Sequence, residues 1–162
     1  MEIISIFESK DGDIWFGTYG NGICKLEEQG DSIQFITYGE QKGLCNNVAY
    51  AIQEDENGNL WISTDNGITN IDSMRHNFRN FYRQDELQGN QFNPGAVFQA
   101  SSGEIFFGDT KGFTYFAPEQ MKTNPVPPRV ILTSLSINNI PVDNHSVDAP
   151  LAKTLQTENE LK

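Results

Sequence analysis

The sequence predicts an all-β fold, and a phrase that occurs three times at a nearly constant interval is the main evidence for it. The three copies span residues 11–18, 57–64 and 102–109 and read DGDIWFGT, NGNLWIST and SGEIFFGD. The glycine at the second position of each copy recurs after 46 and then 45 residues. Repeats of this length that are built from short strands are typical of β-propeller blades.

Each copy begins with a turn signal between two apolar segments. A short polar residue followed by glycine is typical of a tight β-hairpin, because glycine accepts the positive φ angle that such turns need. First strands are expected at residues 3–7, 48–52 and 96–98, and second strands lie within the repeated phrases. The glycines assigned to turns are Gly12, Gly58 and Gly103 before the second strands, and Gly22, Gly67 and Gly112 before the third strands.

Third strands are expected at residues 23–26, 68–71 and 113–116, and fourth strands at 33–38 and 78–82. Four strands per repeat is the usual content of a propeller blade. Each second strand also carries a large aromatic residue, which we expect to pack between adjacent blades because a flat ring buries much area there. These aromatic residues are Trp15, Trp61 and Phe106.

The expected fold class is therefore all-β, with a partial β-propeller of about three four-stranded blades. The blades are expected at about residues 1–40, 41–85 and 86–118. A closed propeller usually has four blades or more. Because repeat units bury their faces only against neighbours, we expect the first and third blades each to expose an apolar face.

The composition changes after residue 118. The proline-rich segment 119–129 is typical of a linker. Residues 130–137 are expected to form a strand, and Asn138–Asn139 a turn into a further short strand. Residues 130–162 are therefore expected to begin a second, incomplete β domain.

The composition also argues against two classes of function. The formal net charge is −11 and the basic residues are scattered, whereas nucleic-acid binding needs clustered Lys and Arg. No apolar run approaches the roughly 18 residues of a membrane span, and the N-terminus lacks the features of a signal peptide. A disulfide between the two cysteines, Cys24 and Cys45, is possible from the sequence, but a pair of free, mostly buried thiols is favoured.

No cofactor, metal site or catalytic centre is expected. Residues 55–58 resemble part of a calcium-binding loop, but Thr64 stands where that loop needs a glutamate, so turn formation explains them better. His76 and His145 have no cysteine or carboxylate at ligand spacing. The sequence contains no G-x-S-x-G motif and no phosphate-binding glycine loop. A propeller lyase or hydrolase would need paired carboxylates or histidine in a shared funnel, and none is visible.

The polar loops between second and third strands form the candidate ligand site. Loops 18–21, 64–66 and 109–111 are expected at the same end of the blades as the long connections 39–47 and 84–94. Asn, Asp and Tyr there could hydrogen-bond sugar hydroxyls or stack on sugar rings, although Asn and Asp beside glycine also shape turns. The candidate ligand-binding residues are Tyr19, Asn21, Asn47, Asp65, Asn66, Asn93 and Lys111.

The repeats resemble those of the two-component regulator propeller family, found in the sensor regions of hybrid regulators of Bacteroides-type bacteria. Residues 54–68 match the family repeat closely, and residues 9–23 match it with one additional loop residue. The third copy departs from it at Phe106 and Asp109, as is typical of the last blade. Residues 127–135 resemble the start of the immunoglobulin-like domain that follows the propeller in those proteins.

The resemblance implies a fragment of the periplasmic sensor region of a hybrid two-component receptor on the inner membrane. Such a segment would sense glycan-derived ligands and pass the signal to a histidine kinase elsewhere in the parent receptor. The implied partners are the remaining blades, the downstream β-sandwich and kinase, an oligosaccharide, and a second copy through exposed blade faces. The alternative function is a non-catalytic structural or dimerisation scaffold that binds no small molecule.

Overall fold

The computed structural model describes residues 2–30, 32–85, 87–121, 136–137 and 140–141. The chain divides into two units, Met1–Lys122 and Thr123–Lys162. Within the described residues, all elements are β-strands except for three 3-10 helices of three residues each. The all-β prediction is therefore confirmed.

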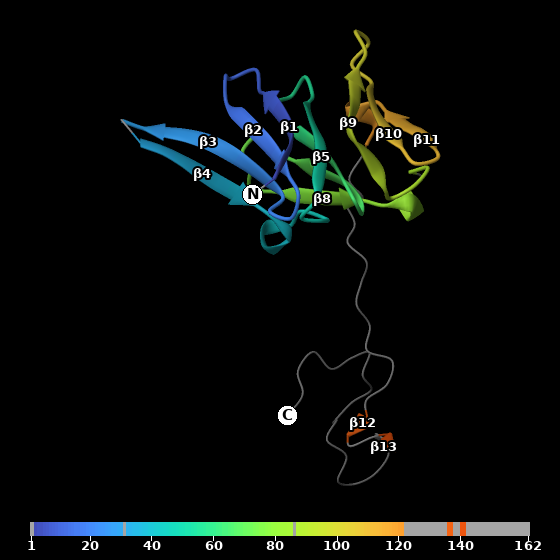
Figure 1. Ribbon diagram of the computed structural model, residues 1–162. Coiled ribbons are helices and arrows are strands. Elements are labelled where there is room, and N and C mark those ends of the chain that lie inside the picture. Colours follow the sequence, from blue (N-terminus) through green and yellow to red (C-terminus); the bar gives the residue numbers. More distant parts are fainter. Residues whose placement is uncertain (1, 31, 86, 122–135, 138–139, 142–162) are drawn as a thin grey trace. The chain divides into compact units, whose positions relative to one another are not determined.

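The first unit contains three antiparallel sheets that follow one another along the chain (Figure 1). Blade 1 consists of β1 (Ile3–Glu8), β2 (Ile14–Thr18), β3 (Ile23–Gln29) and β4 (Ser32–Tyr38). Blade 2 consists of β5 (Ala49–Glu54), β6 (Leu60–Thr64), β7 (Gly67–Ile71) and β8 (Phe78–Phe81). Blade 3 consists of β9 (Phe92–Gln99), β10 (Ile105–Asp109) and β11 (Gly112–Phe116).

In each blade the strands pair in chain order, so every sheet is a meander. Blade 3 has three strands in the described part of the chain. The sequence indicated a fourth strand only in the first two repeats, within an overall expectation of about three four-stranded blades. Short 3-10 helices follow the last strand of each blade: η1 (Glu40–Lys42), η2 (Arg83–Asp85) and η3 (Pro118–Gln120).

The first strands of the blades, β1, β5 and β9, contact one another, as the inner strands of propeller blades do. In blades 1 and 2 the pairing of the first two strands shifts register at the same place, beside Ser5 and Ala51. Such bulges bend a strand and increase its twist. The serial order of the sheets and their converging inner strands are the arrangement of a partial propeller.

Two apolar clusters lie between neighbouring blades. The first joins Trp15 and Ile23 of blade 1 to Ile52, Leu60 and Ile62 of blade 2. The second joins blades 2 and 3, and its buried members are Ala51, Trp61, Ile68, Phe81, Leu87, Phe92, Ile105 and Phe107. Each fully buried large apolar side chain contributes roughly 1.5–3 kcal/mol, so these two clusters are the main source of stability between blades.

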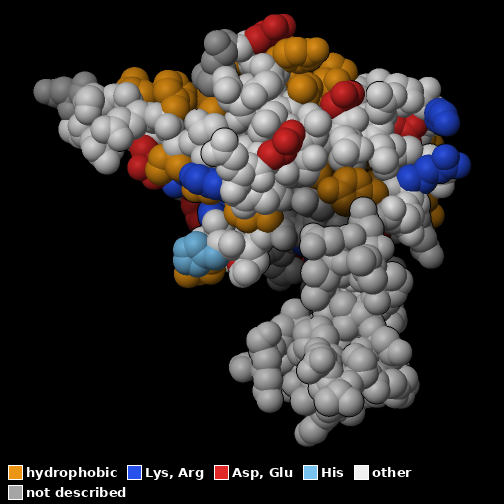
Figure 2. Space-filling view, turned by 90° about the horizontal axis from the view of Figure 1, so that it is seen from below, with side chains coloured by type: hydrophobic (Ala, Val, Ile, Leu, Met, Phe, Trp, Pro, Cys, Tyr) orange, Lys and Arg blue, Asp and Glu red, His pale blue; other side chains and the backbone are white. Residues whose placement is uncertain are grey.

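The outer faces of the series are apolar and exposed, as the repeat count predicted. On blade 1, Ile6 is 67% exposed and Ile33 is 62% exposed. On blade 3, Phe98, Phe113 and Tyr115 are 65%, 57% and 60% exposed. In Figure 2, hydrophobic side chains are visible along the β3–β4 hairpin. The prediction of an exposed apolar face on each terminal blade is confirmed.

The described part of the second unit is one short hairpin, β12 (Ser136–Ile137) paired with β13 (Ile140–Pro141). The linker expected at residues 119–129 is described only up to residue 121. The immunoglobulin-like domain expected at 130–162 lies almost entirely outside the described residues, so it stays a prediction. Among the described residues, no helix has the length and apolar character to cross a membrane.

Candidate functional site

The turns after β2, β6 and β10 and the connections between blades lie at one end of the first unit, which we call the loop end. Each connection is hydrogen-bonded to these turns. The backbone N–H groups of Gly20 and Gly22 donate to the carbonyl of Asn47 at 3.0 and 2.7 Å, and Gly67 donates to Asn90 at 2.7 Å. Figure 2 looks onto this end of the molecule. The loops singled out from the sequence therefore share one surface.

The glycines that begin the third strands explain why the loop end is compact. A Cβ atom at Gly22 would clash with the carbonyl oxygen of Tyr38, and one at Gly67 would meet that of Phe81. Gly112, the equivalent glycine of blade 3, has no atom within 4 Å of its Cβ position. The turn glycines at the opposite end of the blades also have positive φ angles, +84° at Gly12, +79° at Gly58 and +91° at Gly103.

Two tyrosines and a carboxylate form the part of the loop end over blades 1 and 2, which we call the tyrosine cluster: Tyr19, Tyr50 and Asp65. The Tyr50 hydroxyl donates to Asp65 Oδ1 at 3.1 Å. Burial raises the pKa of Tyr50, and the hydrogen bond to Asp65 and its negative charge raise it further. Tyr19 is 61% exposed and offers a ring face to solvent.

The predicted asparagines serve mainly in turns and connections. Asn47 accepts from the N–H of Glu40 at 2.9 Å and donates its own N–H to Glu40 Oε1 at 3.0 Å. Asn93 Nδ2 donates to the carbonyl of Asp109 at 2.9 Å. The backbone of Asn21 donates to Thr18 Oγ1 at 3.1 Å. Asn47 and Asn93 thus use their side chains for the fold, as the turn interpretation expects, while the Asn21 side chain is exposed.

A second part of the loop end lies between the β8–β9 connection and the turn after β10. This polar hollow has a volume of about 230 Å³ and is lined by Arg83, Gln88, Gly89, Asn90, Gln91, Thr110 and Lys111. Asn90 Nδ2 donates to Asn66 Oδ1 at a long 3.4 Å, so the predicted residue Asn66 contacts a residue that lines the hollow together with Lys111.

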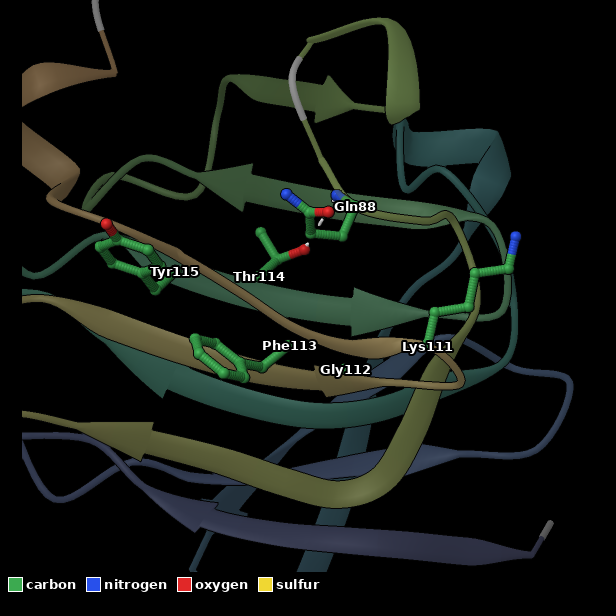
Figure 3. Close-up of a pocket in the computed structure, with 6 residues that line it drawn as sticks. All are labelled: Gln88, Lys111, Gly112, Phe113, Thr114 and Tyr115. Carbon is green, nitrogen blue, oxygen red and sulfur yellow. Dashed lines mark hydrogen bonds between the residues drawn. The ribbon is translucent and has the colours of Figure 1, made fainter.

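An aromatic hollow of about 520 Å³ adjoins it on blade 3. Its lining residues are Gln88, Lys111, Gly112, Phe113, Thr114 and Tyr115, and it shares Gln88 and Lys111 with the polar hollow. Figure 3 shows the rings of Phe113 and Tyr115 on one strand and the hydrogen bond from Gln88 to Thr114. The sequence analysis did not single out Tyr50 and Arg83. Tyr50 could have been found as a tyrosine hydroxyl at the start of β5, and Arg83 as a cation next to the connection 84–94.

The aromatic residues of the second strands have unequal surroundings. Trp15 and Trp61 are buried in the two clusters between blades. The ring neighbours of Phe106 are all in its own blade: Phe98, Phe113 and Tyr115, with centroids 5.4 to 6.3 Å away. The packing of Phe106 against a further blade stays a prediction.

The described residues contain no group of three or more His, Cys, Asp or Glu side chains suited to a metal ion. Asp55, which suggested a calcium loop, accepts from the N–H groups of Asn57 and Asn59 at 2.9 Å each. It therefore stabilises its turn. His76 donates its backbone N–H to Asp72 at 2.8 Å, and His145 lies outside the described residues.

The two cysteines are not joined in a disulfide, so the favoured interpretation is confirmed. The Cys45 sulfur lies 3.2 Å from Thr64 Oγ1 and 3.0 Å from Thr69 Oγ1. Burial raises the pKa of the Cys45 thiol above its usual value, although these hydrogen bonds act in the opposite direction. A protonated, half-buried thiol is a poor nucleophile at neutral pH.

Comparison with known proteins agrees with the fold. Residues 1–20 and 43–66 match the family described as two component regulator propeller. The extracellular domain of a hybrid two-component system from B. thetaiotaomicron is 27% identical with a TM-score of 0.69, over 87% of this chain and 20% of that one. The extracellular domain of a one-component system from the same organism is 25% identical with a TM-score of 0.59, over 74% of this chain and 17% of that one.

A curated relative, histidine kinase P4 from Formosa agariphila, is 26% identical over 155 residues, which is 96% of this chain. The chain spans only 11% of the length of that relative. The fold and the repeated phrase are similar to those of propeller segments of the two-component regulator type. The resemblance inferred from the repeats is therefore confirmed.

Proposed function

We propose that this chain is part of the periplasmic sensor region of a hybrid two-component receptor and binds a glycan-derived ligand at the loop end of its blades. The observation that carries the proposal is the structural match over 87% of the chain to the extracellular domain of a hybrid two-component system. The family match in blades 1 and 2 supports it independently.

The loop end has the chemistry that sugar recognition needs. Sugar rings stack on exposed aromatic side chains, and their hydroxyls pair with amides and carboxylates. Tyr19 presents an exposed ring, the Tyr50 hydroxyl is bonded to Asp65, and Gln88 and Gln91 present amide groups to the polar hollow. In the proposed receptor, binding at these loops shifts blade 3, and the following β-sandwich domain transmits that shift to a kinase elsewhere in the parent protein.

The segment is proposed to be non-catalytic. Its most buried acidic side chains are used in turns: Glu54 accepts from the backbone N–H of Lys10 at 2.6 Å, and Asp55 holds its own turn. A side chain committed to such bonds is not available as a general acid or base in a funnel.

Calorimetric titration of defined oligosaccharides into the full protein tests the proposal. We expect saturable binding that Tyr19→Ala weakens, because the variant removes the exposed ring. Met74→Ala is a matched control, since Met74 is 70% exposed and lies in a turn that contacts Gly58, at the opposite end of the blade from the loop end. Absence of binding by every saccharide tried, with the protein folded, contradicts the glycan-sensing proposal.

A scaffold that associates through blade faces is the second candidate, and the exposed rings of blade 3 favour it. Phe98, Phe113 and Tyr115 form a contiguous aromatic surface of the kind that marks interaction sites. Sedimentation of the full protein distinguishes the two functions: concentration-dependent association that Phe98→Ser abolishes, without saccharide binding, supports the scaffold.

A further inference from the structure

The distribution of positive charge over the described residues is uneven. The protein carries a net charge of −11, and seven of its basic residues lie in the described part. Lys25, for example, forms an ion pair with Asp13 at 2.8 Å. Five of the seven have an ion-pair, hydrogen-bond or ring partner: Lys10, Lys25, Lys42, Arg75 and Arg79.

The other two basic side chains, Arg83 and Lys111, have no ion-pair or hydrogen-bond partner among the described residues, and both line the polar hollow. They come from different elements, η2 and the turn after β10. Their backbones, however, are fixed: Arg83 N–H donates to Asn90 Oδ1 at 2.7 Å, and Lys111 N–H donates to Asp109 Oδ1 at 2.6 Å. Two cationic residues whose backbones are held in place and whose charged groups are unpaired therefore line the same hollow.

Figure 2 shows Lys and Arg side chains at two separate places on this end of the molecule, one of them on the side of blade 3. Although the protein is acidic, Arg83 and Lys111 have no carboxylate partner in the described part of the chain. An anionic ligand would supply a partner for both. The tyrosine cluster over blades 1 and 2 has the opposite character, with Asp65 at its centre.

Two carboxylates lie near the hollow. Asp85 is exposed and accepts from the backbone N–H of Tyr82 at 2.9 Å. Asp109 is buried behind Gly89, with Oδ1 bound to Lys111 N–H and Oδ2 without a hydrogen-bond partner. Neither is within ion-pair distance of the Arg83 or Lys111 head group, so both cations remain available to a ligand.

The surroundings of the two cations suit a saccharide rather than a free inorganic anion. Gln88 and Gln91 supply amide donors and acceptors for hydroxyl groups. The aromatic hollow continues from Gln88 and Lys111 to the exposed rings of Phe113 and Tyr115 (Figure 3). A ring that stacks there would place a charged substituent within reach of Lys111.

We propose that the polar hollow binds an acidic saccharide, whose anionic group is held by Arg83 and Lys111 and whose hydroxyls pair with the amides around it. This inference rests on the proposed sensing function and specifies the class of ligand. A uronic acid carboxylate and a sulfate ester share the required chemistry, since each presents oxygen atoms that accept charge-assisted hydrogen bonds.

The test is calorimetric titration of the full protein with four probes: a galacturonate oligosaccharide, a sulfated oligosaccharide and the neutral counterpart of each. We expect one or both acidic probes to bind and the neutral ones to bind at least about tenfold more weakly. The double variant Arg83→Gln/Lys111→Gln should weaken acidic binding by a further factor of about ten or more, and higher salt should weaken it in the wild type only.

The control is Lys25→Gln, which removes a positive charge from an ion pair in blade 1 and leaves the hollow intact. It should leave the affinity for the acidic probe unchanged. Both substituted residues are exposed, so the unfolding temperature of the double variant should match that of the wild type.

The outcomes separate the two proposals. Neutral probes that bind as tightly as acidic ones, or acidic binding unaffected by the double variant, overturn the acidic-saccharide inference while leaving the sensing function in place. No binding by any probe overturns both.

Discussion

The two junctions between blades are built from the same repeat, yet they differ in both their interior and their loop end. In the interior of the junction between blades 2 and 3, Trp61 Nε1 donates to the buried carboxylate of Asp55 at 3.0 Å. In the junction between blades 1 and 2, Trp15 Nε1 is buried without a hydrogen-bond partner. The two indoles differ because the residue at the turn position that can accept the indole N–H differs between the repeats.

The first residue of each turn donates its N–H to the residue four positions later, which identifies Ser9, Asp55 and Ala100 as equivalent. Asp55 accepts from two backbone N–H groups and from Trp61, whereas Ser9 accepts only from Asp13 N–H. Blade 3 has Ala100 and no indole. A carboxylate in the turn and an indole in the next strand therefore act as a unit, complete only in blade 2.

The loop ends of the junctions differ in charge. Over blades 1 and 2, the Tyr50 hydroxyl donates to Asp65, and the asparagine of the connection is bound to Glu40. Over blades 2 and 3, unpaired Arg83 and Lys111 line the polar hollow. The repeat thus conserves the sheet while its connections vary in chemistry, which is how one scaffold can offer different binding surfaces.

The largest expected effect is at the turn acceptors. Asp55→Ala removes four hydrogen bonds and leaves Trp61 Nε1 buried without an acceptor, so we expect a loss of about 2–4 kcal/mol in the free energy of unfolding. The matched variant Ser9→Ala removes one hydrogen bond and should cost about 1 kcal/mol or less. Urea denaturation of both measures the difference, and equal losses would contradict the view that the additional hydrogen bonds of Asp55 stabilise the junction.

An intermediate effect is expected at the indoles themselves. Trp61→Phe leaves Asp55 Oδ2 without its indole donor and should cost about 1–2 kcal/mol more than Trp15→Phe, which removes an unsatisfied N–H. Both variants lose similar apolar area, so the comparison isolates the hydrogen bond. A larger loss for Trp15→Phe in the same denaturation experiment would contradict this explanation of the junctions.

The smallest effect concerns pH. Because the folded-state pKa of Tyr50 is raised above its ordinary value of 10.0, its contribution to stability is complete below pH 10 and is lost as the pH rises through the folded-state pKa. The denaturation midpoint of the wild type should therefore fall more steeply above pH 10 than that of Tyr50→Phe. If the denaturation midpoints of the two proteins fell equally with pH, Tyr50 would not be a source of the pH dependence of stability.

Most of the fold was predictable because the determinants are local and repeated. The turn glycines and the Trp phrases specify hairpins without long-range information, and they predicted the strands of blades 1 and 2 closely. The first strand of blade 3 was predicted less closely: it was expected at residues 96–98, whereas β9 spans Phe92–Gln99, because Pro94 and Gly95 within it interrupt the apolar strand pattern.

The candidate site was predicted only in outline. The sequence indicated which loops meet at one end, but not that the side chain of Asn47 is used by Glu40 or that Arg83 faces Lys111. Such pairings depend on how a connection of one blade lies against a turn of the next. Periodicity alone contains no information about that contact.

Hydrogen–deuterium exchange of the full protein, with and without the tightest-binding acidic saccharide, tests most directly whether the two loop ends differ in function. We predict that the ligand slows exchange in residues 82–91 and 109–112 and leaves residues 19–22 and 39–48 unchanged. Protection confined to residues 19–22 and 39–48 would place the ligand over the tyrosine cluster and contradict the assignment of anion binding to the junction between blades 2 and 3.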